Sequence, residues 1–493
     1  MERKPGSTSK PQFLMVTPDH YRISYVINPW MEGNINRTAL EKAQNQWENL
    51  YKIVSGFADV QLMDGRDGLP DMVFTANAGL VIENRVLLAR FYHPERRGEE
   101  ELFSEWFESN GFKVAQIPEG IFFEGAGDAL LDCDGRWLWA GYGLRSSLES
   151  HPYIAETFNI ETLSLRLTDK RFYHLDTCFC PLPKGYLMYI PSAFDAPSNR
   201  LIEERIAPDK RIVLDEVEAP AFSANAVAIG ETIIMNHCFP SLRQKLARAG
   251  FSVVETCMSE FMKAGGSAKC LTIRLDEKAI ENREEISTVT SRTVKVTGQL
   301  IDSGLMTEML DIIVNGGGSF RIDELKPGYK KNEVSTAKIE VIAPRDEVLN
   351  RLIQKLVRQG ATLSGIENGD AILAAVKADG VAPEHFATTT IYPTDIMVNG
   401  EWLRVENQRM DGVIVLNNGS AKCSLIRDLK KGDMVVTGGL GVKVSTLSDK
   451  SDSGEKFSFM GSGVSSERKV EIAIDRVAWE MGRIKERAGK LVV

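Results

Sequence analysis

A structural unit recurs along the first 280 residues, and this repetition limits the fold more than any other feature of the chain. Each unit reads as a polar residue, an apolar strand, a polar turn, a second apolar strand and a helix-like stretch, as at residues 74–89 and 222–250. The helix-like stretches include residues 97–110, 197–206 and 241–250, and a further strand is expected within residues 13–28. The polar residues that begin the units, at intervals of roughly 48 residues, are Asn77, Glu124, His174, Asn225 and Cys270. The pattern predicts an α/β domain built from ββαβ units in a radial array.

Such an array has to close, so its first and last strands are expected to complete one unit together. The starts of the strands then converge, and Glu124, His174 and Cys270 become neighbours although they lie far apart in the sequence. A nucleophile, a base and a group that stabilises charge are what a cysteine-dependent reaction needs. The plainer interpretation is that these are separate polar caps of strands in a mixed α/β domain.

The composition excludes several other classes of protein. The chain has 493 residues, and its net charge of -9 gives no support for binding to nucleic acid or to a membrane surface. No apolar run is long enough to span a bilayer, and residues 1–11 read as a disordered tail without a signal core. The seven cysteines are sparse and irregularly spaced, which indicates free thiols in the cytoplasm. Cys178 and Cys180 lack the spacing of zinc ligands, so no metal is expected.

Four short motifs resemble those of the guanidine-modifying enzymes, the pentein superfamily that includes arginine deiminases, dimethylargininases and dihydrolases. They are FTAN at residues 74–77, EGAGD at 124–128, HLDT at 174–177 and GGSAKC at 265–270. The resemblance implies a pentein catalytic domain over residues 12–283, folded as a five-bladed pseudo-symmetric α/β propeller. It also implies a covalent thiouronium intermediate formed without a metal or an organic cofactor.

The whole chain resembles the cyanobacterial arginine dihydrolases that are fused to an ornithine cyclodeaminase module. In that family L-arginine is converted to L-ornithine, two ammonia and carbon dioxide. The resemblance implies that NAD is needed only if the C-terminal cyclodeaminase module, expected to be missing here, were present. It also implies a homo-oligomer, with a tetramer as one form, whose only other partner is L-arginine.

The resemblance assigns the catalytic roles residue by residue. Cys270 is the nucleophile on the guanidino carbon, and His174 is the general acid and base that protonates ammonia and activates water. Glu124 is expected to pair with the guanidinium by charge-assisted hydrogen bonds. Alternation along an extended strand places Asp176 on the same side as His174, where it could orient the imidazole or bind the guanidinium.

Asn77 stands where deiminases carry an aspartate. An ionised carboxylate only accepts hydrogen bonds, whereas an amide both accepts and donates. Asn77 can therefore accept from a guanidinium and then donate to the carbonyl of a ureido group, which predicts that citrulline is held as a second substrate. An arginine deiminase that releases citrulline and a non-catalytic arginine sensor remain the alternatives.

Further residues are expected to bind the amino-acid end of the substrate. An arginine suits a carboxylate because the guanidinium pairs with it in a bidentate manner. The candidates for substrate binding are Asn28, Asn77, Arg96, Asp128, Arg145 and the carbonyl of Ala264. A structural role is favoured more strongly for Asp128 than for Glu124, because its position allows it to cap the loop. Asn225 is interpreted as structural.

The repeat is lost after residue 283, and residues 286–493 predict a smaller α+β domain. Strands at 287–301, 320–322 and 337–342 alternate with helices at 305–315 and 346–359. This order resembles the conserved region of lysine-ketoglutarate reductase/saccharopine dehydrogenase proteins.

The end of the chain carries two further signals. The glycines within 437–441 stand between two strands, which indicates a hairpin or a bulge rather than a dinucleotide fingerprint. Residues 467–490 predict a helix and 490–493 the start of a strand, so the chain is expected to end just before a dinucleotide-binding module.

Overall fold

The structure is a computed structural model that describes residues 10–280, 289–298, 300, 304–327, 335–363, 370–383, 386–389, 393–417, 419–438 and 441–444. Outside this range lie residues 1–9 of the predicted tail, residues 281–288, and the predicted C-terminal helix and strand at 467–493. No helix of the described part is both long and apolar enough to cross a membrane.

Residues 10–280 form five three-stranded sheets with one shared design. In each sheet the middle strand pairs antiparallel with one neighbour and parallel with the other. The sheets, in order, are β15-β1-β2, β3-β4-β5, β6-β7-β8, β9-β10-β11 and β12-β13-β14. The strands are β1 (Gln12–Val16), β2 (Asp59–Met63), β3 (Gly79–Ile82), β4 (Arg85–Leu88), β5 (Lys113–Ala115), β6 (Ala129–Leu131), β7 (Leu138–Tyr142), β8 (Thr162–Arg166), β9 (Phe179–Leu182), β10 (Tyr186–Tyr189), β11 (Arg211–Val213), β12 (Val227–Ile229), β13 (Thr232–Met235), β14 (Ser252–Glu255) and β15 (Ile273–Arg274).

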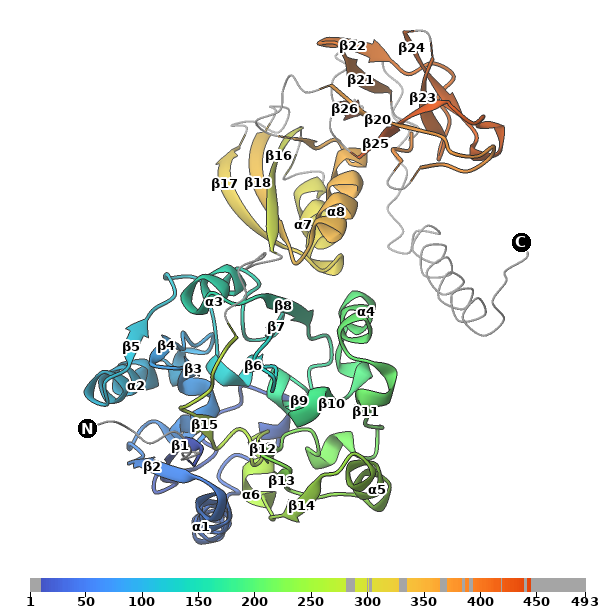
Figure 1. Ribbon diagram of the computed structural model, residues 1–493. Coiled ribbons are helices and arrows are strands. Elements are labelled where there is room, and N and C mark those ends of the chain that lie inside the picture. The colour runs from blue at the N-terminus through green and yellow to red at the C-terminus, as the bar shows by residue number, and fades with distance from the viewer. Residues whose placement is uncertain are drawn as a thin grey trace, which may run out of the picture. The chain divides into compact units, whose positions relative to one another are not determined.

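One helix connects the two parallel strands of every sheet, because a parallel pair needs a long crossover. These helices are α1 (Leu40–Phe57), α2 (Gly98–Ser109), α3 (Ser150–Phe158), α4 (Ala196–Arg205) and α5 (Pro240–Arg248), and a short α6 (Ser259–Met262) precedes the last turn. Figure 1 shows α1, α2, α4 and α5 at the periphery of this region, with the strands inside. The predicted ββαβ unit and the three helix-like stretches are thus confirmed.

The pairing of β1 with β15 confirms that the first and last strands share one sheet, with Phe13 opposite Arg274. The strand predicted within residues 13–28 is too long, because β1 ends at Val16 and irregular chain follows. The polar residues that begin the units also do not lie on strands. Asn77 lies within the 3-10 turn Thr75–Ala78 that precedes β3, and Glu124 and His174 each come directly before such a turn.

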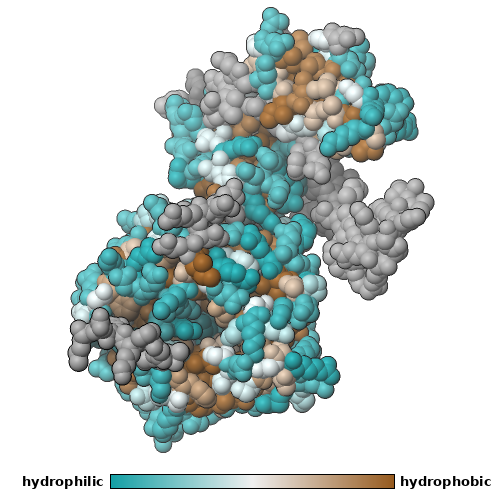
Figure 2. Space-filling view, viewed as in Figure 1, coloured by the Kyte–Doolittle hydropathy of each residue, from teal (hydrophilic) through white to brown (hydrophobic). Residues whose placement is uncertain are grey.

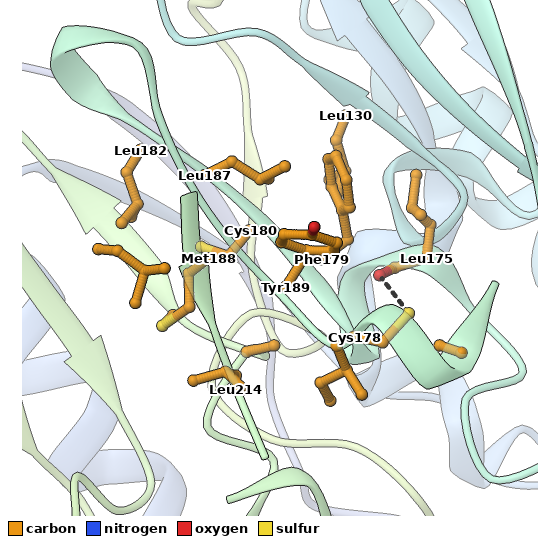
Figure 3. Packing of buried hydrophobic residues seen from close by; sticks show 14 of the residues in the cluster. Leu130, Leu175, Cys178, Phe179, Cys180, Leu182, Leu187, Met188, Tyr189 and Leu214 are labelled. Carbon is orange, nitrogen blue, oxygen red and sulfur yellow. Dashed lines mark hydrogen bonds between the residues drawn. The ribbon is translucent and has the colours of Figure 1, made fainter. Parts of the chain in front are cut away.

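Large apolar side chains fill the space between neighbouring sheets. Figure 3 shows Cys178 and Cys180 packed with Leu175, Phe179 and Met188 in one such cluster. The thiol of Cys178 donates to the carbonyl of Leu175 at 3.5 Å. Both cysteines are therefore part of the apolar core.

Residues 290–363 form a four-stranded antiparallel sheet with order β17-β18-β16-β19. Its elements are β16 (Thr290–Gly298), α7 (Leu305–Asn315), β17 (Ser319–Lys326), β18 (Ser335–Ala343), α8 (Asp346–Arg358) and β19 (Thr362–Leu363). Figure 1 shows α7 and α8 together beside this sheet. Leu349, Leu352 and Leu356 recur at helical spacing on α8 and are buried, which explains why the amphipathic pattern predicted this helix.

Residues 370–444 form two small sheets, β20-β25-β23-β24 and β22-β21-β26. Their strands are β20 (Ile372–Ala375), β21 (Thr394–Val398), β22 (Glu401–Arg404), β23 (Val413–Asn417), β24 (Ser420–Ser424), β25 (Met434–Thr437) and β26 (Val442–Val444). The predicted hairpin at the glycines is wrong, because β25 and β26 belong to different sheets. Figure 2 shows apolar residues at the surface over these strands, and the exposed apolar side chains there include Trp402 and Met410.

Candidate active site

The turns that precede the first strands of the sheets bring the predicted catalytic residues together. Asn77, Glu124, His174, Asp176 and Cys270 are all at most 3% exposed. Close approach of these turns needs small residues, and a Cβ on Gly127 would lie 2.2 Å from the Asn77 Nδ2 atom. The glycines of the second motif therefore serve to bring one turn against the next.

Glu124 is the centre of a buried network of charges. Its Oε2 atom lies 2.6 Å from His174 Nε2 and 3.0 Å from Arg145 Nη1, and its Oε1 atom accepts from the backbone N–H of Tyr92 at 3.2 Å. Burial alone would raise the pKa of Glu124, but Arg145 and His174 hold it well below its ordinary value. The carboxylate is therefore ionised and fixes the imidazole.

Cys270 lies beside a second carboxylate. Its Sγ atom is 3.4 Å from Asp176 Oδ2 and 3.6 Å from Asp176 Oδ1. Burial, with the negative charge of Asp176, raises the pKa of the Cys270 thiol well above its ordinary value. Burial also raises the pKa of Asp176 to about 7, although Lys269 opposes this shift. The resting cysteine is thus a thiol that faces a carboxylate able to take its proton.

Asp176 does not share a strand face with His174 as alternation predicts. Residues Leu175–Thr177 form a 3-10 turn, which points the two side chains to different partners. Asp176 faces the sulfur of Cys270, whereas His174 faces Glu124. The prediction placed Asp176 at the site for the wrong geometric reason.

The two glycines before the cysteine permit a crowded loop. Gly265 has a φ of +89°, and a Cβ on it would lie 2.6 Å from the Tyr173 hydroxyl. A Cβ on Gly266 would lie 2.6 Å from the ring of Phe74. Both positions therefore exclude any larger residue from the loop that carries Cys270.

Asn28 and Ala264 meet beside this loop. The Asn28 amide donates to the Ala264 carbonyl at 3.0 Å, and its Oδ1 atom accepts from the backbone N–H of Trp30 at 3.0 Å. The hydroxyl of Tyr173 also donates to the Ala264 carbonyl, at 3.4 Å. The structure thus brings the two residues to the site and shows them bonded to each other.

The two candidate arginines have different surroundings. Arg96 donates through four of its five N–H groups: to Glu99 at 2.9 and 2.8 Å, to the Asp71 carbonyl at 3.2 Å and to Asn77 Oδ1 at 2.8 Å. One N–H group cannot bind a carboxylate in a bidentate manner, so the geometry disfavours Arg96 as the carboxylate anchor. Within the described part of the chain, Arg145 donates to Glu124 and to the carbonyl of Ile27, the latter at 2.8 Å, and its remaining N–H groups are available to a ligand.

Asp128 joins two turns, which agrees with the structural role favoured for it from the sequence. Its carboxylate accepts from the Ser146 hydroxyl at 2.6 Å and from the backbone N–H of Leu175 at 3.0 Å. Burial raises the pKa of Asp128 to about 6, and the positive charge of His174 opposes that shift.

Sequence reasoning missed Asp71, which lies outside the phase of the repeat. Its Oδ2 atom accepts from the hydroxyl of Tyr25 at 2.9 Å, while its Oδ1 atom is buried and has no hydrogen-bond partner among the described residues. Burial raises the pKa of Asp71, and the charges of Arg96 and Arg145 oppose this shift. A buried acceptor without a donor needs an explanation, and a bound ligand group is one. The leucine-proline-aspartate run at 69–71 gives no signal of this role.

Residues 25–276 match the family model of eukaryotic N,N-dimethylarginine dimethylhydrolases. The fold and the buried Glu-His-Cys arrangement thus define a dimethylarginine dimethylhydrolase-like α/β enzyme. Residues 291–392 match the conserved region of LOR/SDH bifunctional enzymes, and 393–474 match the first C-terminal region of ArgZ-like arginine dihydrolases.

The chain is 50% identical over 492 residues to the bifunctional arginine dihydrolase/ornithine cyclodeaminase AgrE of Nostoc sp., an alignment that covers 99% of this chain and 70% of AgrE. It is 48% identical over 489 residues to ArgZ of Synechocystis sp., with 98% of this chain and 69% of ArgZ covered. This chain therefore belongs to the family of bifunctional arginine dihydrolase/ornithine cyclodeaminases.

Solved structures of these relatives agree with the fold. AgrE in complex with ornithine and NAD+ has a TM-score of 0.86 at 49% identity, covering 98% of this chain and 70% of AgrE. A cysteine-to-serine variant of the ArgZ N-terminal domain bound to substrate has a TM-score of 0.55 at 57% identity, covering 55% of this chain and all of that domain. An asparagine-to-serine variant of that domain, at a TM-score of 0.54, is covalently bound to a reaction intermediate.

Two expectations about the C-terminal part are corrected. The C-terminal module is not simply missing, since residues 393–474 match a C-terminal region of ArgZ-like proteins and the chain spans 70% of AgrE. The expectation that NAD is needed only if a missing cyclodeaminase module were present is also wrong, since the solved complex of the relative AgrE contains NAD+. Among the described residues, however, Gly441 is followed by the strand β26 rather than by a helix, so this glycine does not open a dinucleotide site. We assign no catalytic step to NAD.

Proposed function

We propose that this chain hydrolyses L-arginine to L-ornithine, two ammonia and carbon dioxide through a covalent intermediate on Cys270. The proposal rests on one buried network of contacts. In this network Glu124 contacts both Arg145 and His174, and Cys270 contacts Asp176. Membership in the arginine dihydrolase family supports the same substrate.

In the first step the Cys270 thiol gives its proton to Asp176, and the sulfur attacks the guanidino carbon. His174 then protonates the departing amino group, which leaves as ammonia while a thiouronium stays bound to sulfur. His174 next takes a proton from water, which adds to the same carbon. The carbon–sulfur bond breaks, its electron pair returns to sulfur, and citrulline results. A second water is consumed when citrulline is converted to ornithine, ammonia and carbon dioxide.

Glu124 keeps His174 oriented, since their 2.6 Å contact joins two buried groups. The same carboxylate pairs with the guanidinium of the substrate. Asn77 has one amide N–H directed to the Glu124 carbonyl at 3.2 Å, which leaves the other free to donate to the oxygen of citrulline.

The amino-acid end of arginine is held by groups of opposite sign. Arg145 binds the carboxylate with its remaining N–H groups, and the unpartnered Oδ1 atom of Asp71 accepts from the α-ammonium. Asn28 positions the Ala264 carbonyl toward the substrate. Arg96 acts on the substrate through Asn77, which it holds by a hydrogen bond of 2.8 Å.

The product ratio tests the proposed reaction. Purified protein incubated with arginine should release two ammonia for each ornithine, with little free citrulline. One ammonia for each citrulline would indicate a deiminase. Binding of arginine without products would indicate a sensor. Cys270→Ser should abolish turnover, and full activity of that variant would overturn the covalent mechanism.

Several broader features of the protein belong to the same proposal. The five sheets of residues 12–283 form the blades of a propeller, which is supported by the sheet that β1 and β15 share. The α+β region over 286–493 contributes to a homo-oligomer, supported by the exposed apolar side chains at Trp402 and Met410. Light scattering tests this assembly. The seven cysteines, all without a disulfide, favour the cytoplasm.

A further inference from the structure

Asn225 is bound to the cysteine loop through every polar atom of its side chain. Its Oδ1 atom accepts from the backbone N–H groups of Ser267 at 3.1 Å, Lys269 at 3.1 Å and Cys270 at 3.3 Å. Its Nδ2 atom donates to the Asp176 carbonyl at 2.9 Å and lies 3.0 Å from the Sγ atom of Cys270. The side chain is completely buried.

These contacts fix which end of the amide faces the sulfur. Backbone N–H groups can only donate, so the atom that meets three of them has to be the oxygen. The other end meets the carbonyl of Asp176, which can only accept. The amide nitrogen therefore faces Cys270, and one of its two hydrogens is available to the sulfur.

We propose that Asn225 is a catalytic hydrogen-bond donor that stabilises the sulfur of Cys270 whenever it carries negative charge. The proposal rests on the function proposed above, in which the sulfur loses its proton before attack and regains an electron pair when the carbon–sulfur bond breaks. Asn225 and Asp176 thus act on different protonation states of the Cys270 sulfur. Asp176 accepts the proton of the thiol, and Asn225 donates to the thiolate that remains.

The repeat makes this assignment more specific. Asn225 and Asn77 occupy the same position in two units, within the same alanine-asparagine-alanine run. Asn77 lies against the Glu124 carbonyl and Arg96, whereas Asn225 lies against the nucleophile. The same position of the repeat is thus used by Asn77 for the substrate and by Asn225 for the sulfur.

Asn225→Asp tests the donor, because a carboxylate keeps the acceptor for the three backbone N–H groups but cannot donate to sulfur when ionised. Alkylation of Cys270 by iodoacetamide is followed by peptide mass spectrometry across pH 6–10, since the exposed Cys133 and Cys257 also react. We expect alkylation at pH 8 to slow by about 10- to 100-fold, the range for a hydrogen bond to a charged group, and its midpoint to move to higher pH. Turnover should fall by a similar factor.

Asn225→Ser is the second variant, because its shorter hydroxyl can donate but cannot hold three backbone groups. It should melt at a lower temperature than the wild type and yet keep more thiol reactivity than Asn225→Asp. Asn236→Asp is the matched control, since Asn236 joins the Ala221 carbonyl to the Met258 N–H away from the sulfur. An unchanged alkylation profile in a folded Asn225→Asp, or the same shift in Asn236→Asp, overturns the proposal. These readouts need no turnover, so they stand apart from a failure of the proposed reaction.

Discussion

The Arg96 guanidinium donates to Asn77 Oδ1 at 2.8 Å and is itself locked by Glu99 and by the Asp71 carbonyl. Burial alone would lower the pKa of Arg96, but the charge of Glu99 raises it above its ordinary value. The amide of Asn77 is thus oriented by a permanent cation, with its nitrogen directed away from Arg96. This contact joins Arg96 to the residue that we propose selects between one and two hydrolytic steps.

Asn77→Asp should shift the products toward citrulline. The carboxylate still accepts from Arg96 but loses the N–H that donates to a ureido oxygen. We expect the ratio of citrulline to ornithine to rise at least tenfold, measured by chromatography of the products. Asn110→Asp, at the exposed end of α2, serves as the control and should leave the ratio unchanged. A ratio of two ammonia per ornithine in Asn77→Asp would contradict this role.

Lysine substitutions should separate the two arginines. Arg145→Lys removes a bidentate donor for the substrate carboxylate, so KM for arginine should rise by about 10- to 100-fold. Arg96→Lys cannot form the two bonds to Glu99 and loosens Asn77, so it should change the ratio of citrulline to ornithine more than it changes KM. Steady-state kinetics with product analysis checks both. Equal effects of the two substitutions on KM would place Arg96 at the carboxylate after all.

Glu124→Gln should impair both stability and catalysis. The substitution removes the partner of a buried Arg145, which costs about 3–5 kcal/mol in comparable buried pairs. It also frees His174, so kcat should fall by about 10²- to 10⁴-fold. Denaturant unfolding and turnover measure the two effects. The exposed Glu119→Gln is the control, and a loss of the same size there would show that the network around Glu124 is not the cause.

The rate should depend on the ionisation of Asp176. Burial raises its pKa to about 7, so below that pH its carboxyl group is protonated and cannot accept the thiol proton. We expect kcat/KM to fall as the pH drops through about 7 and to level off above it. Asp128, with a pKa raised to about 6 by burial, loses its proton at a lower pH than Asp176. A profile that is flat between pH 6 and 8 would rule out proton transfer to Asp176.

Two glycine-to-alanine substitutions should have opposite effects on stability. Gly127→Ala places a Cβ 2.2 Å from the Asn77 amide, so it should destabilise by about 1–3 kcal/mol and lower turnover. Gly56→Ala, in exposed α1 with nothing within 4 Å, should stabilise by about 0.5–1 kcal/mol. Thermal melting compares them. Equal melting temperatures for the two variants would contradict the close packing of the turns.

The repeat predicted which catalytic residues are neighbours, because residues at equivalent positions of successive units lie at equivalent positions of successive sheets. It could not predict what each side chain faces, since that depends on short turns of 3-10 form. Asp176 was placed by alternation that the turn at Leu175–Thr177 does not have. The repeat does include Asn225. Its contact with Cys270, however, joins two different units and has no signature in the local sequence. Asp71 lies out of phase, and only its unpartnered oxygen reveals it.

The strand pairing of β1 with β15 also has a consequence for how this enzyme acquires activity. The contact between Gln12 and Asp276 spans 264 positions, so the loop it closes contains nearly the whole of the first region. Closing such loops is slow because chain entropy is lost before contacts form. During synthesis His174 and Glu124 emerge long before Cys270. The nucleophile therefore joins its partners only when the last sheet assembles, and hydrolytic competence should appear in a single late event of folding.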